Sequence, residues 1–260
     1  MTAWTPGALA PSPGAAPVSS MLRSQTVAEL KLVLRSGEQV LLSLVIPLGL
    51  LVLLVLVPFI AVDGASSRGL RADFFVPGVL ALAVMSTAFT GQAIGVGFER
   101  QYGVLKRLGA TPLPRAVLLG AKTLAVLAVE VLQVAVIGLV GLALGWSPQG
   151  QVLPVLLLVV LGTAAFSGLG LLLGGTLRGL TTLAAANLVW FVLLVLGGVL
   201  FPLSAFGGAQ DVLSLLPTAA LSTGLREALQ DGTLPFRELA ALAVWAVLSL
   251  GAASRLFRWE

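Results

Sequence analysis

The sequence predicts an all-α polytopic membrane protein with six transmembrane helices. Three observations lead to this prediction: 58% of the 260 residues are hydrophobic, only 10% are charged, and the charges leave long uncharged stretches between them. A soluble domain typically has about 25% charged residues. Because so few charges cannot cover a water-facing surface, lipid must surround much of the chain. This composition excludes an ordinary soluble enzyme and a nucleic-acid-binding domain.

Several kinds of chemistry are excluded by residues that the chain lacks. It has no histidine and no cysteine, so the usual ligands of zinc, copper and iron–sulfur sites are missing. Ser-His-Asp and Cys-His catalytic groups are excluded for the same reason. Lys122 precedes a threonine, but Ala116 and Ala121 stand where a phosphate-binding loop needs glycine. We therefore predict no enzyme activity, no metal and no cofactor, and we expect another chain to bind any ATP.

The chain begins with two segments that differ from the rest. Residues 1–20 are rich in Ala, Pro, Ser and Thr and predict a disordered tail. Residues 21–38 alternate apolar and charged residues at helical spacing, which predicts an amphipathic helix of roughly 25 Å in the headgroup plane. The alternative is a cytoplasmic extension of the first span. Met21 opens this segment, so translation starting at Met21 in place of Met1 stays open.

The transmembrane domain is expected to cover residues 39–260. A span needs about 20 apolar residues. The spans that follow from the uncharged stretches are 39–62, 74–98, 116–146, 152–177, 179–206 and 237–255. If the N-terminus is cytoplasmic, 11 of the 15 Lys and Arg residues lie in cytoplasmic segments. Because basic residues favour that side, we predict both termini in the cytoplasm and the protein in the cell membrane.

The loop at residues 99–115, after the second span, has the most informative pattern. Its short helical segment places the apolar residues Val104, Leu105 and Leu108 beside Lys106 and Arg107, and a Thr-Pro turn follows. A cytoplasmic loop that is both charged and apolar favours a docking surface for a soluble partner. The alternative is a topology anchor that contacts lipid headgroups.

This loop resembles the signature that follows the second span of type-2 ABC transporter permeases, E-R-x-x-G-x-L-x-x-L-x-x-T-P. The matching residues are Glu99, Arg100, Gly103, Leu105, Leu108, Thr111 and Pro112. Shorter resemblances in the same order are Leu34-Arg35 before a span with Pro47, Pro77-Gly78, Asn187 followed by the run 197–202, and Leu216-Pro217. Together these resemblances cover roughly residues 28–255.

The resemblance implies the permease subunit of an ABC exporter. In that family two six-span subunits, identical or paralogous, form the path for a lipid, glycan, drug or other amphiphile, and each binds a separate cytoplasmic ATPase. The implied ATPase-coupling residues are Glu29, Arg35, Glu99, Arg100, Gly103, Leu105, Lys106, Arg107, Leu108, Thr111 and Pro112. The expected partners are therefore an ATPase subunit, a second permease subunit and membrane lipids. The alternative is a stand-alone secondary transporter or channel, which commonly has inverted repeats and several intramembrane charges.

Polar residues inside the spans are further candidates. Glu130 lies near the middle of the third span, where an ionised side chain is costly, and Gln133 lies near it. A transport path and helix packing both stay open for this pair. Asn187 in the fifth span is a candidate for a buried hydrogen bond between helices, and a transport path stays open for it too. Lys122 is expected to extend to the inner membrane surface.

The segment before the last span is expected to contain short helices. Its residues alternate apolar and charged positions, and glycine and proline interrupt it. The resemblance implies a re-entrant region in the outer leaflet, and the alternative is an amphipathic surface helix. The residues singled out for the re-entrant region are Gly197, Gly198, Pro202 and Pro217.

Charge reversal at Arg100 or at Lys106 is expected to weaken the coupling of ATP hydrolysis to transport, because the loop would lose its contact with the ATPase. The measurement is substrate-stimulated ATP hydrolysis by the complex, with membrane insertion as the control. Unchanged stimulation in both variants would contradict the docking assignment.

Overall fold

The computed structural model describes residues 15–57 and 67–257, and these residues form helices and connecting segments without a strand. The α-helices are α1 (Val18–Arg35), α2 (Gly37–Leu56), α3 (Arg68–Met85), α4 (Gln92–Gln101), α5 (Val104–Gly109), α6 (Arg115–Ala143), α7 (Val152–Thr176), α8 (Gly179–Leu196), α9 (Gln210–Leu213), α10 (Pro217–Arg226) and α11 (Phe236–Leu256). A π-helix at Ser86–Gly91 joins α3 to α4, a 3-10 helix covers Leu203–Ala209, and a second π-helix covers Glu227–Asp231. The predicted all-α class is confirmed.

Five helical segments are long and apolar enough to cross a membrane. They are Arg68–Gln101, Arg115–Ala143, Val152–Thr176, Gly179–Leu196 and Phe236–Leu256, and they match the second to sixth predicted spans. The first predicted span corresponds to α2, whose apolar part is Ser43–Leu56, while residues 58–62 of that span lie outside the described residues. The chain is therefore a multi-pass membrane protein, and the count of six spans stays a prediction.

Two predicted boundaries are wrong, and one helix extends beyond its predicted span. Helix α1 begins at Val18, directly after Pro17, so the last residues assigned to the tail are helical; residues 1–14 of that tail lie outside the described residues. The helix of the second predicted span extends beyond residues 74–98, since it begins at Arg68, where Ser67 caps it. The fifth span ends at Leu196 rather than at 206, because Gly198 adopts a left-handed conformation with φ of 70°.

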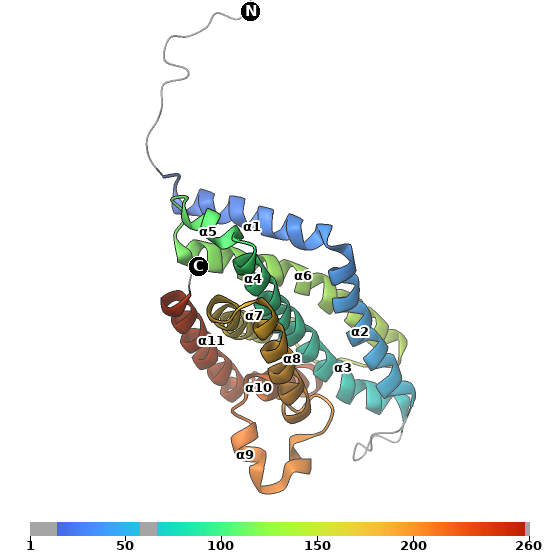
Figure 1. The fold of residues 1–260 in the computed structure, drawn as a ribbon. Coiled ribbons are helices and arrows are strands. Elements are labelled where there is room, and N and C mark those ends of the chain that lie inside the picture. Colours follow the sequence, from blue (N-terminus) through green and yellow to red (C-terminus); the bar gives the residue numbers. More distant parts are fainter. Residues whose placement is uncertain (1–14, 58–66, 258–260) are drawn as a thin grey trace, which may run out of the picture.

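Helix α1 lies across one end of the bundle (Figure 1). It packs along α6 and meets α2 at Ser36, whose backbone is not helical. Figure 1 shows α1 and α2 at an angle, so α1 is not a straight extension of the first predicted span. Helix α5 and the C-terminal end of α11 lie at the same end, and α9 lies at the opposite end.

Helix α7 is central and packs against α3, α4, α6, α10 and α11. Its contact with the second span depends on glycine. A Cβ atom on Gly170 would lie 2.5 Å from the carbonyl oxygen of Phe89 in the π-helix, and one on Gly174 would lie 2.6 Å from that of Ala93. The two backbones therefore approach as closely as small residues allow, which fixes α7 against the π-helix and α4.

Two arginines stabilise helix ends at the opposite end from α1. Arg71 donates to the carbonyl oxygens of Val55 at 3.3 Å and Val57 at 3.0 Å, where α2 ends. Arg226 donates to the carbonyl oxygen of Gly198 at 2.7 Å, and its guanidinium lies 4.1 Å from the centre of the Phe74 ring. Cations at the C-terminal ends of helices satisfy free carbonyl groups and the helix dipole. These arginines therefore fix the ends of α2 and α8.

The segment between the fifth and sixth spans divides into an exposed part and a buried part. Residues 204–216 are largely exposed, whereas α10 folds into the bundle. Helix α10 begins at Pro217, and its residues from Pro217 to Ser222 are all buried against α3, α7 and α11. Gly197 and Gly198 are buried as well, and Pro202 is half-buried. The alternative of an amphipathic surface helix is therefore wrong for α10, while its depth in the outer leaflet stays a prediction.

Alanine at Gly170 is expected to destabilise the protein by about 1–3 kcal/mol, because its Cβ would overlap backbone of the π-helix. The matched control is Gly95→Ala in α4, where a Cβ meets nothing within 4 Å. That change is expected to be neutral or to stabilise the helix by up to about 1 kcal/mol. Unfolding of both variants in one detergent is the measurement, and equal effects would contradict the packing described above.

Candidate functional site

Helix α5 is a separate short helix held between α4 and α6. Gly103 has a φ of 71°, a left-handed conformation that disfavours any side chain, and it turns the chain from α4 into α5. After α5, the Thr111 hydroxyl donates to the carbonyl oxygen of Leu108 at 2.6 Å, and Pro114 precedes the first residue of α6. The predicted short helix and Thr-Pro turn are therefore present at the expected residues.

One face of α5 is anchored in a small hydrophobic cluster. Leu105 is completely buried in this cluster, which also contains Leu118 of α6 and Phe257 next to the end of α11, and Leu108 packs against it. The opposite face of α5 exposes Lys106 and Arg107. Because apolar burial fixes the helix from below, α5 presents its basic side outward from a fixed position.

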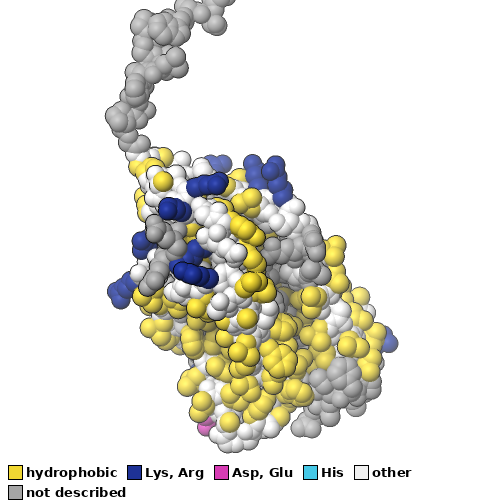
Figure 2. All heavy atoms as spheres, in the orientation of Figure 1, with side chains coloured by type: hydrophobic (Ala, Val, Ile, Leu, Met, Phe, Trp, Pro, Cys, Tyr) yellow, Lys and Arg dark blue, Asp and Glu magenta, His cyan; other side chains and the backbone are white. Residues whose placement is uncertain are grey.

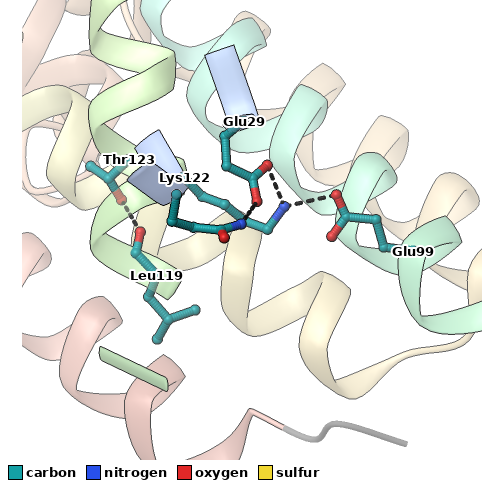
Figure 3. Close-up of polar contacts among 6 residues, drawn as sticks. Glu29, Glu99, Leu119, Lys122 and Thr123 are labelled. Atoms are coloured by element: carbon teal, nitrogen blue, oxygen red, sulfur yellow. Dashed lines mark hydrogen bonds and ion pairs between the residues drawn. The ribbon is translucent and has the colours of Figure 1, made fainter. Parts of the chain in front are cut away.

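A buried ion triad lies beneath this surface. Lys122 of α6 donates through Nζ to Glu29 Oε2 of α1 at 2.9 Å and to Glu99 Oε1 of α4 at 2.7 Å. Figure 3 shows the lysine side chain reaching between the two carboxylates. Gln25 donates to Glu29 Oε1 at 2.8 Å. The triad therefore joins three helices that are far apart in the sequence.

The triad is held by mutual compensation of buried charges. A buried charge is costly unless it is paired and hydrogen-bonded. Lys122 is 6% exposed and Glu29 is 7% exposed, so each depends on the other and on Glu99. Glu99 Oε2 has no hydrogen-bond partner in the described part of the chain. Separating α1 or α4 from α6 would leave a charge unpaired inside the protein. The free-energy cost of that charge opposes the separation.

Arg100 points into the protein rather than toward a soluble partner. Its Nη1 donates to the carbonyl oxygens of Gly175 at 3.2 Å and Leu177 at 3.3 Å, at the C-terminal end of α7. A cation at this place stabilises the free carbonyl groups of the helix end. Arg100 therefore positions α4 against α7. Arg100 and Lys106 are the two residues predicted to contact the ATPase, and of these Lys106 faces outward.

The implied coupling residues divide by exposure into three groups. Those on the surface are Arg35, Lys106, Arg107, Thr111 and Pro112. Those of intermediate exposure are Glu99, Arg100, Gly103 and Leu108, and those buried are Glu29 and Leu105. The structure thus separates an outward surface from the residues that hold it in place.

The expectation that Lys122 extends to the membrane surface is wrong. Lys122 is buried because two carboxylates, 93 and 23 residues away in the sequence, surround its ammonium group. The sequence contains a signal that could have indicated this arrangement. Glu29 follows Leu22 by two helical turns and precedes Val33 by one, so it falls on the apolar face of its helix.

The polar residues inside the predicted spans have different surroundings. Gln133 of α6 is buried, and its side-chain nitrogen contacts the carbonyl oxygen of Ser43 in α2 at 3.0 Å and the hydroxyl of Thr87 in the π-helix at 3.0 Å. Glu130 is completely buried and contacts Thr163 of α7. Asn187 is exposed on α8, so the prediction of a buried amide is wrong within a single chain. Helix α8 turns Ala186 inward, and its neighbour Asn187 therefore points away from the bundle.

Basic side chains gather at the end of the molecule that carries α1 and α5. Figure 2 shows Lys and Arg side chains at this end and a broad hydrophobic surface over the rest of the visible face. The exposed basic residues of α1, α5 and the start of α6 are Arg23, Lys31, Arg35, Lys106, Arg107 and Arg115. The site is thus a basic surface of two helices, α1 and α5, that the triad and the Leu105 anchor fix to the spans.

Comparisons with known proteins agree with this architecture. The family model described as "ABC-2 family transporter protein" matches residues 57–255. The protein named "Putative transport permease YvfS" from Bacillus subtilis (strain 168) is 26% identical over 239 residues, which cover 88% of this chain and 94% of the relative. The family match includes α3 to α11, and with them Glu99 and Lys122 of the triad.

Replacement of Lys122 by methionine is expected to destabilise the protein by about 3–5 kcal/mol, because two buried carboxylates lose their counter-charge. The matched control is the triple variant Glu29→Gln, Glu99→Gln, Lys122→Met, which is neutral at all three positions and is expected to recover most of this loss. Unfolding of the purified chain in detergent measures both values. A triple variant as unstable as the single variant would show that charge compensation is not what the triad supplies.

Proposed function

The chain belongs to the ABC-2 transporter family and is the membrane subunit of an ABC transporter, and from this premise we propose that it works as a permease for export. Two copies of the chain, or this chain and a paralogue, form the path for a lipid, glycan, drug or other amphiphile. A separate ATPase subunit binds and hydrolyses the ATP. The subunit itself has no catalytic residue, metal or cofactor in this proposal.

The observation that carries the proposal is the anchored position of α5. Leu105 fixes this helix from below, and the triad fixes the neighbouring α4 to α6 and α1. A soluble ATPase can move a membrane helix only through a stiff contact. Because α5 connects α4 directly to α6, a force applied to its exposed face reaches the second and third predicted spans together. This arrangement supports α5 and α1 as the ATPase-docking surface.

The distribution of charge supports the proposed orientation. The exposed Lys and Arg residues of α1 and α5 lie at one end of the molecule (Figure 2). Basic residues favour the cytoplasmic side of a membrane. We therefore place α1, α5 and both termini in the cytoplasm and the protein in the cell membrane, with α9 and the region around Gly198 toward the outside.

Charge reversal at Arg107, Arg107→Glu, is expected to reduce the amount of ATPase that co-purifies with the tagged chain by about threefold to tenfold. The reason is that an exposed ion pair contributes roughly 0.2–1 kcal/mol, and the reversed charge adds repulsion. Arg107 is exposed on α5 and takes no part in the triad. The measurement is the ratio of ATPase to permease in complexes purified from native membranes.

The matched control is Arg68→Glu, a reversal of the same size at an exposed residue at the start of α3. Arg68 lies at the other end of the second predicted span, so its reversal is expected to leave the ATPase ratio unchanged. If both variants retain the ATPase equally, or if no ATPase co-purifies with the wild-type chain, the docking proposal is wrong.

A further inference from the structure

Glu130 is a completely buried carboxyl group in the middle of the third predicted span. At 1.5 Å per residue it lies about 22 Å along the helix from Arg115, the first residue of α6. Neither the triad nor the α5 surface includes it. Its contacts bear on the protonation state of this carboxyl group.

The contacts of Thr163 allow the protons to be counted. The Thr163 hydroxyl lies 2.7 Å from the carbonyl oxygen of Val159, one turn earlier in α7, and it also lies within hydrogen-bond distance of Glu130 Oε2. Each contact is a full hydrogen bond when one proton lies between its two oxygen atoms. A hydroxyl group has only one proton, so Thr163 donates a full hydrogen bond to one of the two oxygens.

A protonated Glu130 supplies the proton for the other contact. A threonine hydroxyl in a helix commonly donates to the carbonyl group one turn earlier, so the Thr163 proton lies toward Val159. Glu130 then donates its own proton to the Thr163 oxygen. An ionised Glu130 has no proton to give, and its contact with Thr163 would place two lone pairs against each other.

The surroundings of Glu130 agree with a neutral acid. Glu130 Oε1 is buried without a hydrogen-bond partner, and Glu130 forms no ion pair with the residues that the structure describes. An ionised carboxylate with a bare oxygen is strongly unfavourable at such a depth. A neutral carboxyl group tolerates the same place, because its carbonyl oxygen carries no full charge.

We propose that Glu130 is a proton-binding site that holds its proton at neutral pH and donates it to Thr163. The proton joins α6 to α7 at mid-membrane, one turn from the place where Gln133 joins α6 to α2 and to the π-helix. Glu130 is thus a positioning residue in the transmembrane bundle. This inference is independent of the proposed docking of an ATPase.

The test is infrared spectroscopy of the full chain in lipid vesicles at neutral pH. A protonated carboxyl group gives a carbonyl stretching band that an ionised carboxylate lacks. The wild-type spectrum minus that of Glu130→Gln is expected to show one such band, which shifts when the sample is transferred to heavy water. The matched control is Asp231→Asn, an exposed acid, whose difference spectrum is expected to show none.

A second variant keeps the test decisive if Glu130→Gln does not fold. Thr163→Val keeps the acid but removes its acceptor, so the band is expected to remain and to move to higher frequency as the hydrogen bond is lost. A folded Glu130→Gln protein whose difference spectrum lacks the band would overturn the proposal. A band whose frequency is the same in Thr163→Val as in the wild type would overturn the assignment of Thr163 as the acceptor.

Discussion

The ammonium group of Lys122 between the carboxylates of Glu29 and Glu99 is the interaction on which the end of the structure that carries α1 and α5 depends. It joins α1, α4 and α6 in a place where Lys122 and Glu29 are buried and Glu99 is half-buried, so that the three charges depend on one another. Hydrophobic burial holds helices together without fixing how they are turned. The ion triad fixes how the three helices are rotated relative to one another, since both carboxylates must face the same lysine.

The same constraint explains why α5 can act as a stiff element although it spans only Val104–Gly109. A helix of this length is not stable alone, so its position comes from its neighbours. Leu105 reaches the cluster around Phe257, Arg100 binds the end of α7, and Glu99 binds Lys122. A movement of α5 is therefore a movement of the helices to which it is tied, which is what coupling to an ATPase requires.

Much of this could be predicted from the sequence, because the relevant signals are local. The uncharged stretches located five spans, and the apolar residues Leu105 and Leu108 with the Thr-Pro turn after them located α5. The end of the fifth span was misplaced because no charge marks it, and the break at Gly198 lies in its backbone conformation. The face of Asn187 was misassigned because α8 is apolar on all sides, so its pattern does not show which side meets the bundle.

The sequence by itself determined the class of the protein, its five long apolar helices and the short helix α5 on which the proposed docking surface lies, because composition, charge and helical period act over short stretches of chain. Only the tertiary structure decided that Lys122 pairs with Glu29 and Glu99, that Arg100 faces inward, and that Glu130 meets Thr163. These partners lie on different helices. A helical period shows which face of a helix a side chain occupies, but only the packing of the helices determines what that face meets.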